Sequence, residues 1–183
     1  MNQDSINTGV SFNTNQVLNN NGPNTIQYLK NRAGKQATFR VTGCSFNGNT
    51  NTDGNGTILS IVMNQQSESI DVTDITVAIE SSFFINNTAN SIIKISYVNS
   101  KNGMSVTGNT FINNAYDISM ILEGSIYKNM QIKNNNFNDI GNEFVRVNAP
   151  YVPNVQVCSY HGDNKIPEKF QKYSIKIQNI IFF

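Results

Sequence analysis

The stretch Phe84-Ile85-Asn86-Asn87-Thr88-Ala89 returns along this chain in altered forms. Related phrases, each with Asn three residues after Phe, are Phe12-Asn13-Thr14-Asn15, Phe46-Asn47-Gly48-Asn49 and Phe111-Ile112-Asn113-Asn114. Self-similarity at a period of a few tens of residues is typical of a solenoid, in which each unit buries its apolar face against the next. The repeat therefore predicts a fold far more directly than it predicts a function.

A fifth unit begins at Phe137 and reads Phe137-Asn138-Asp139-Ile140, so its Asn has slipped from the repeated position. An aliphatic residue lies five places before the later Phe residues, at Val41, Ile79, Val106 and Ile132. We place a sixth unit at Cys158-Ser159-Tyr160-His161-Gly162-Asp163, with Tyr160 in place of Phe and Val155 matched to Val41. The aromatic spacings are then 34, 38, 27, 26 and 23 residues, and the last three are close to one coil of a β-helix.

The two longer spacings contain polar stretches that we interpret as insertions. Residues 19–24 and 47–57 consist almost entirely of Asn, Thr, Gly, Asp and Pro, which favour turns, and we expect both stretches to protrude. We expect a third protrusion at 64–69.

Between the Phe residues the apolar pattern has period two, as in Ile92-Ile93-Lys94-Ile95 and Phe144-Val145-Arg146-Val147. This pattern predicts strands of four to six residues. No long stretch has the apolar spacing of a helix. The only stretch where we expect that a helical turn could form is 166–172.

Three short parallel strands per repeat, each stacked on its equivalents about 4.8 Å away, form a right-handed single-stranded parallel β-helix. We therefore expect an all-β solenoid of about six coils, built as a single domain over residues 1–183, with 164–183 as an irregular or terminal coil. The Phe rings should stack inside it. The Asn residues suit the turns because Asn tolerates positive φ and its amide can bond to the Asn one coil away.

Charge and hydropathy narrow the function classes. The 183 residues carry a formal net charge of +1 without a basic cluster, so we expect no nucleic-acid binding. The sequence has neither an apolar run long enough for a transmembrane helix nor a signal peptide. An uncapped beginning and an apolar ending lead us to expect a piece of a longer solenoid, whose unpaired edges could associate end to end.

The two cysteines, Cys44 and Cys158, fall at the same place in units four coils apart. Four coils of about 4.8 Å exceed the roughly 7 Å between Cα atoms that a disulfide permits. We expect two free, buried thiols.

Phe-x-x-Asn units followed by Ala, as in Phe84-Ile85-Asn86-Asn87-Thr88-Ala89 and Phe111-Ile112-Asn113-Asn114-Ala115, resemble the repeat of polymorphic outer-membrane proteins and similar surface adhesins. The resemblance covers residues 6–163, although the Gly-Gly-Ala-Ile motif of that family is missing. It implies a pectin-lyase-like β-helix at the cell surface or outside the cell, without catalytic activity, that could contact a host or cell-surface glycan or protein.

The alternative is an enzyme of the pectate lyase or polygalacturonase kind, which acts on polysaccharide in a groove along the coils. Asn51-Thr52-Asp53-Gly54 and His161-Gly162 match parts of polygalacturonase motifs. Glycoside hydrolysis needs paired carboxylates. No Asp-Asp pair follows Asp53, and His161-Gly162-Asp163 matches Asn47-Gly48-Asn49 of the repeat, so we interpret both motifs as turn residues.

The remaining acidic residues do not return at the same position of successive repeats. They are Glu68, Asp71, Asp74, Glu80, Asp117, Glu123, Asp139 and Glu143. Asp71 and Asp74 could form half of a Ca²⁺ site, but a solvated loop explains them better. The sequence contains no zinc cluster, phosphate loop or serine elbow. We therefore expect no catalytic, cofactor-binding or metal-binding residues and no cofactor.

Two sequons, Asn55-Gly56-Thr57 and Asn86-Asn87-Thr88, could carry glycans if the chain is secreted by a eukaryote. Our hypothesis is a structural or adhesive surface module whose loops and flat coil faces make contacts. A trimeric tailspike-like depolymerase is a third class.

Overall fold

The computed structural model describes the backbone of residues 2–3, 7–30, 36–51, 53, 56–63, 74–96, 104–123, 130–148, 155–157 and 176–177. Side chains are described for 9–29, 38–51, 53, 56–62, 76–96, 104–122, 131–132 and 134–139. The described part is all β, without a helix, and every strand pair in it is parallel. The strands form three columns, and one passage of the chain through them is called a repeat below.

The first column is a six-stranded sheet whose neighbours are equivalent strands of successive repeats. In order it contains β2 (Asn7–Asn13), β5 (Gln36–Thr42), β9 (Asp74–Glu80), β13 (Met104–Thr107), β15 (Met130–Lys133) and β17 (Val155–Val157). Val41, Ile79, Val106 and Ile132 share one register row, as the sequence predicts.

The second and third columns belong to one 12-stranded sheet. The second column contains β3 (Gln16–Leu18), β6 (Ser45–Asn47), β10 (Phe83–Ile85) and the first parts of β14 (Thr110–Glu123) and β16 (Asn136–Asn148). The third contains β1 (Asn2–Gln3), β4 (Asn24–Lys30), β8 (Thr57–Met63), β12 (Ser91–Ser96), the rest of β14 and β16, and β18 (Lys176–Ile177). Two short strands, β7 (Thr50–Asn51) and β11 (Thr88–Ala89), lie between these columns.

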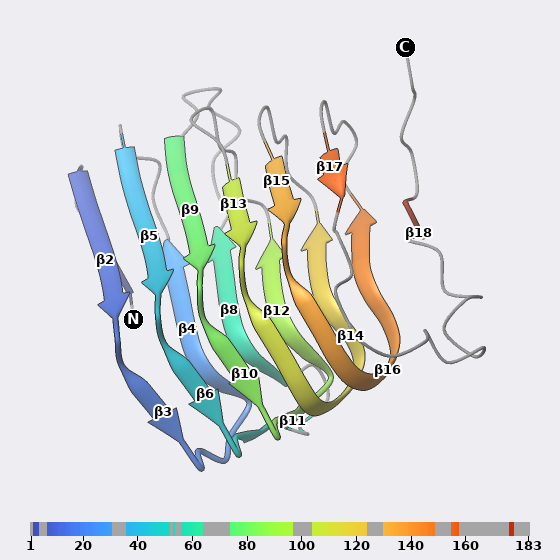
Figure 1. Ribbon diagram of the computed structural model, residues 1–183. Helices are drawn as coiled ribbons and strands as arrows, with labels where there is room; N and C mark the ends of the chain where they lie inside the picture. The colour runs from blue at the N-terminus through green and yellow to red at the C-terminus, as the bar shows by residue number, and fades with distance from the viewer. Residues whose placement is uncertain are drawn as a thin grey trace.

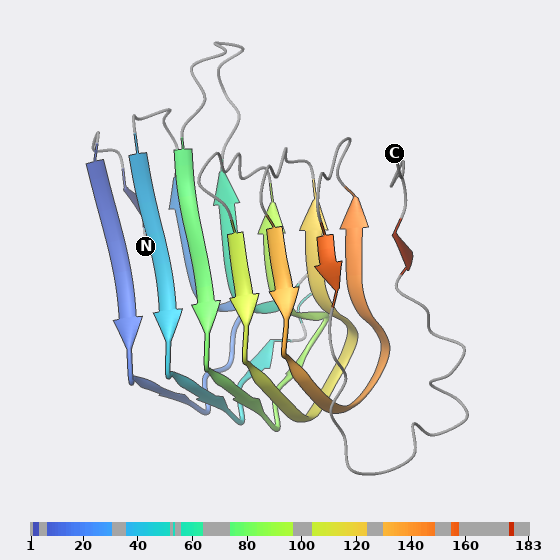
Figure 2. The ribbon, with the colours of Figure 1, turned by 45° about the horizontal axis from the view of Figure 1, so that its top comes forward.

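Each repeat runs along the first column, crosses at the second and returns along the third, so the strands curl into a nearly closed, barrel-like section (Figures 1 and 2). This arrangement is compatible with a β-helix. β14 and β16 are 14 and 13 residues long, not the expected four to six, because each continues around the corner between two columns. The expected helical turn at 166–172 lies outside the described residues.

The Phe rings of the second column stack inside the section, as predicted. Centroid distances are 4.8 Å for Phe46 and Phe84, 4.9 Å for Phe84 and Phe111, and 4.6 Å for Phe111 and Phe137, and the ring planes are within 14° of parallel. These distances equal the spacing of neighbouring strands, so strand pairing fixes the stack. An aromatic pair adds about 0.5–1.5 kcal/mol beyond its area burial.

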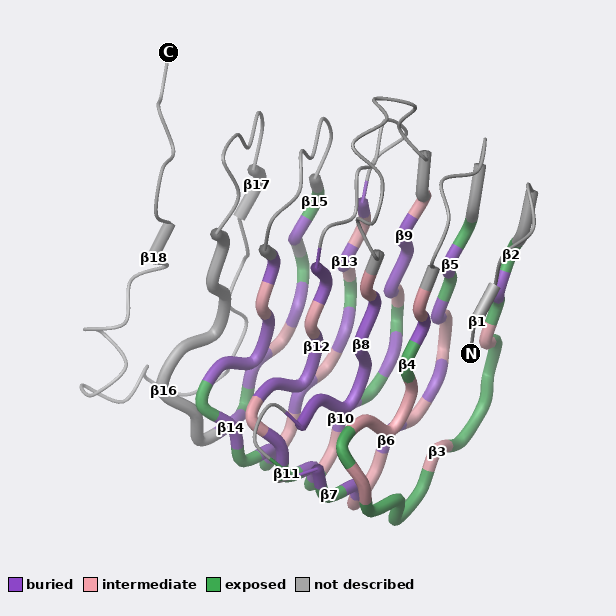
Figure 3. Tube along the Cα trace, turned by 180° about the vertical axis from the view of Figure 1, so that it is seen from behind, coloured by how far each residue is buried: buried purple, intermediate pink, exposed green. Residues whose placement is uncertain are grey.

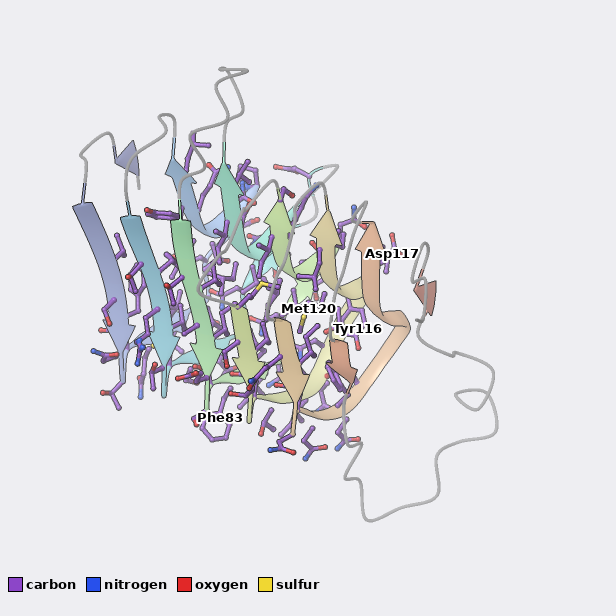
Figure 4. All side chains as sticks on the ribbon, turned by 90° about the horizontal axis from the view of Figure 1, so that it is seen from above. Phe83, Tyr116, Asp117 and Met120 are labelled. Carbon is purple, nitrogen blue, oxygen red and sulfur yellow. The ribbon has the colours of Figure 1, made fainter. Side chains whose placement is uncertain are left out.

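Aliphatic side chains from the first and third columns complete the core around this stack. In the third column two inward rows run through equivalent residues, namely Leu59, Ile93 and Met120, and Ile61, Ile95 and Leu122. Figure 3 shows that buried residues predominate along β8, β12 and the later part of β14. Figure 4 shows Met120 inside the section.

The predicted register of the first unit is wrong. Phe12 pairs with Val41, and Val17, five residues later, takes the row of Phe46. Phe12 mimics the repeated phrase because Asn15 follows it, but Phe12 lies on β2, where its ring contacts Phe39 with 6.0 Å between centroids. Its row is otherwise occupied by aliphatic residues.

The sixth unit is also displaced from its predicted register. Val157 pairs with Ile132 and therefore takes the row of Val41, whereas Val155 pairs with Met130. A shift of two residues keeps the same side of the strand, so period two alone could not detect it. Tyr160 and His161 lie outside the described residues.

The first expected insertion is absent, whereas the second is present within its predicted range. Residues 19–24 contain no insertion, because Val17 to Ile26 spans nine residues and so does the equivalent stretch from Phe84 to Ile93. In the second repeat, Phe46 to Leu59 spans 13 residues, four more. Asn49 and Asn51 are nevertheless fully buried there, so these two residues do not protrude. The third, at 64–69, lies outside the described residues.

Adjacent residues of β10 test the stack, since Phe84 is fully buried while Phe83 is 47% exposed. Replacing Phe84 by Ala should lower the free energy of unfolding by about 3–5 kcal/mol, because it removes a buried ring from between two others. Replacing Phe83 by Ser should change it by less than about 0.5 kcal/mol. Urea unfolding followed by circular dichroism measures both, and equal effects would contradict the assigned faces.

Candidate functional site

Left-handed residues mark both corners of the second column. Before the column they are Thr14, Gly43, Ser81, Gly108 and Asn134, and after it Asn19, Gly48, Asn86 and Asn113, with φ between 50° and 67°. Gly and Asn adopt this conformation at the least cost. From the second repeat onward, the residue that follows each of them is buried, and these buried residues form two ladders.

The first ladder, called the Asn20–Asp139 ladder, consists of Asn20, Asn49, Asn87, Asn114 and Asp139. Asn87 illustrates the bonding of its members. Its Oδ1 accepts from the backbone N–H and the side-chain amide of Asn49 at 3.0 and 2.9 Å, and its Nδ2 donates to Asn114 Oδ1 at 2.8 Å and to the Phe46 carbonyl at 3.0 Å. All four bonding positions of the amide are used inside the protein. The ladder therefore satisfies buried corners that would otherwise cost about 1–3 kcal/mol per unpaired group.

Asp139 ends the described ladder in place of an Asn. Its Oδ1 accepts from the Asn114 backbone N–H at 2.9 Å and from the Asn114 Nδ2 at 3.0 Å, and its Oδ2 lies 3.2 Å from the same Nδ2. The slip of one residue after Phe137 is compensated by a register shift between β14 and β16, beyond Ile112. The side chain is 7% exposed, and burial raises the pKa of Asp139 to about 6, against the lowering effect of its hydrogen bonds from Asn114.

Tyr116 and Ser119 extend this polar site from the same strand, β14. Both residues are buried, and neither hydroxyl has a hydrogen-bond partner with good geometry. Burial first, and then the charge of Asp139, raise the pKa of Tyr116 far above its ordinary value, so the phenol stays neutral. Figure 4 places Tyr116 on β14. A buried carboxyl beside a neutral phenol can bind or release one proton.

The second ladder, called the Cys44–Asn135 ladder, lies at the other corner and contains Cys44, Ser82, Asn109 and Asn135. Asn109 Oδ1 accepts from the Ser82 N–H at 3.0 Å, and Asn109 Nδ2 donates to Asn135 Oδ1 at 3.0 Å. Cys44 is a buried free thiol whose Sγ lies 3.3 Å from the Phe12 carbonyl. The prediction of a free, buried Cys44 is confirmed, while Cys158 lies outside the described residues.

The outer face of the second column is flat and uncharged. Its two outward rows are Gln16, Ser45, Phe83, Thr110 and Asn136, and Leu18, Asn47, Ile85, Ile112 and Asn138. Phe83 and Leu18 are 47% and 46% exposed, and they are the large apolar side chains that the described part exposes to solvent. Phe83 points away from the enclosed section (Figure 4). This set of ten residues is called the outer face below.

The acidic residues singled out in the sequence are not brought together where the structure describes them. Asp53 is exposed beside the β7 corner, and Asp117 is exposed on β14. The described residues contain no group of three His, Cys, Asp or Glu side chains able to hold a metal ion. Glu68, Asp71 and His161, and the side chains of Asp74, Glu123 and Glu143, lie outside the described part.

The sequence shows that the Asn after Phe137 is displaced from the repeated position. It did not lead us to predict that Asp139 takes this position in the ladder. The available signal was an acidic residue within one position of a repeated Asn.

The two sequons also differ in the structure. Asn86 is an exposed left-handed turn residue, whereas Thr57 of the other sequon is buried, with its hydroxyl 3.0 Å from Ser91 Oγ.

Asn86 and Asn87 provide a matched pair of test positions for the ladder. Replacing Asn87 by Ala should cost about 3 kcal/mol of unfolding free energy or more, because it leaves donors on Asn49 and the Phe46 carbonyl without partners. Replacing Asn86 by Gly should be neutral or stabilising by up to about 1 kcal/mol, since Gly adopts a positive φ without strain. Thermal and urea unfolding measure both changes. If Asn87→Ala lowered the unfolding free energy only slightly, the ladder would contribute little to stability.

No family model, curated protein or solved structure matches the chain. Among the residues that the structure describes, no helix is long and apolar enough to cross a membrane.

Proposed function

We propose that this chain is a section of a right-handed parallel β-helix of about six coils, similar to pectin-lyase-like repeat proteins. We further propose that it acts without catalysis as a structural or adhesive module, at the cell surface or secreted. The observation that carries this proposal is the outer face, where Phe83 and Leu18 are about half exposed on a flat parallel sheet.

The interior supports a scaffold role because the amides of the Asn20–Asp139 ladder join successive repeats. The side-chain amides of Asn49, Asn87 and Asn114 are bonded along the ladder, and the rings of Phe46, Phe84 and Phe111 are fully buried. A stack held at every corner is stiff, since each repeat contacts the one before and the one after it. Side chains that point outward from such a scaffold keep fixed spacings.

The outer face supports contact with an uncharged partner. None of its ten residues is charged, and Phe83 lies between Ser45 and Thr110 in the neighbouring strands. Ile85 pairs with Ile112 and continues the apolar surface to the next repeat. An exposed apolar patch with hydroxyl and amide groups around it is typical of an interaction site. We infer a neutral glycan or an uncharged protein surface as the partner.

Binding to a panel of immobilised neutral and anionic polysaccharides tests the proposal, with new reducing or unsaturated ends measured in the same samples. We expect retention on a neutral ligand without turnover. Replacing Phe83 by Ser should weaken that binding at least about tenfold, equivalent to about 1.4 kcal/mol. Gln131→Ser, at an exposed position of the first column, is the control and should bind normally.

Turnover of any polysaccharide would overturn the non-catalytic role and favour the lyase or hydrolase alternative. In that case, Asp53→Ala would show whether the exposed Asp53 takes part. Equal binding by the Phe83 and Gln131 variants would remove the outer face from the proposal.

A further inference from the structure

We propose that Asp139 makes the joint between β14 and β16 dependent on protonation: the neutral carboxyl completes the Asn20–Asp139 ladder, and the ionised carboxylate leaves a charge inside the stack. This proposal does not depend on the binding function. It concerns how firmly one repeat is held on the next.

The first step of the argument compares Asp139 with the other ladder members. Asn49, Asn87 and Asn114 each donate from Nδ2 to the carbonyl of the second-column residue one repeat earlier, at 3.0, 3.0 and 2.8 Å. Phe137, in the same repeat as Asp139, pairs with Phe111, so by register the carbonyl at the equivalent position is that of Phe111. A carboxylate has no hydrogen to donate, whereas a neutral carboxyl has one. Taking one proton from solvent therefore supplies the donor that this ladder position otherwise uses.

The second step concerns charge. Asn114 and Tyr116 are the residues that interact with the Asp139 carboxyl, and both side chains are neutral. Asp117, on the same strand as Tyr116, is exposed. The side chains of Glu123 on β14 and of Glu143 and Arg146 on β16 lie outside the described part. Among the described side chains that face it, the buried carboxylate therefore meets the Asn114 amide and the Tyr116 hydroxyl, which both favour the ionised form, and no cation.

The third step gives the direction of the pH effect. Burial raises the pKa of Asp139 from 3.8 to about 6. Below pH 3.8 both the folded and the unfolded chain hold this proton, and the full stability is present. Between pH 3.8 and about 6 the unfolded chain releases the proton first, so stability falls as the pH rises, and above about 6 the loss is complete. The folding equilibrium constant should decrease on the order of 100-fold across this window.

Two measurements on the purified chain test the proposal. A ¹³C NMR titration of the wild-type carboxyl groups should show one Asp, absent from the spectrum of Asp139→Asn, that titrates near pH 6. Urea unfolding between pH 4 and pH 7.5 should show the wild type losing stability relative to Asp139→Asn by about 100-fold in the equilibrium constant. The side-chain amide of the Asn variant has a donor at every pH.

Asp117→Asn is the matched control, because it removes a carboxylate from an exposed position of the same joint. Its pH profile should follow the wild type. Titration of Asp139 near pH 4 would overturn the proposal, and so would parallel pH profiles for the wild type and Asp139→Asn. If the Asn variant does not fold, residue-specific assignment of the wild-type carboxyl resonances identifies Asp139, and its titration then decides.

Discussion

Strict axial register is the constraint on which the rest of this structure depends. Each strand pairs in parallel with its equivalent one repeat away, at a spacing close to 4.8 Å. Phe84 can stack between Phe46 and Phe111, and Asn87 can bond to Asn49 and Asn114, only because the same residue type returns at the same register. Aromatic stacking and amide ladders therefore support the backbone pairing that positions them.

The ladders also explain how a chain rich in Asn can have a well-packed interior. Buried amides are costly unless every donor and acceptor is bonded, and the stack provides these bonds at each corner. Hydrogen bonds linked in a chain strengthen one another. Asp139 departs from this pattern at the last described ladder position, while Phe83 and Leu18 depart from the polar pattern of the surface. These departures carry our two proposals because stacking alone does not require them.

The structure corrects the sequence interpretation mainly where local composition imitated the repeat. Phe12-Asn13-Thr14-Asn15 matches the repeated phrase, but the inward positions of β2 pair Val10 with Phe39 and Phe12 with Val41. Likewise, 47–57 looks like a loop by composition, although Asn49 and Asn51 are buried. Composition cannot separate an Asn that turns the backbone, such as Asn86, from an Asn that bonds inside, such as Asn87.

The sequence by itself determined the all-β class, the row of Val41, Ile79, Val106 and Ile132, and the stack from Phe46 to Phe137, because period-two alternation and regular spacing are local properties of the chain. Only the tertiary structure decided which residues meet between repeats. The ladder position of Asp139, its raised pKa and the uncharged outer face around Phe83 all depend on the register of strands more than twenty residues apart. Register over that distance is set by the best joint packing of all three columns, which no single stretch of sequence specifies.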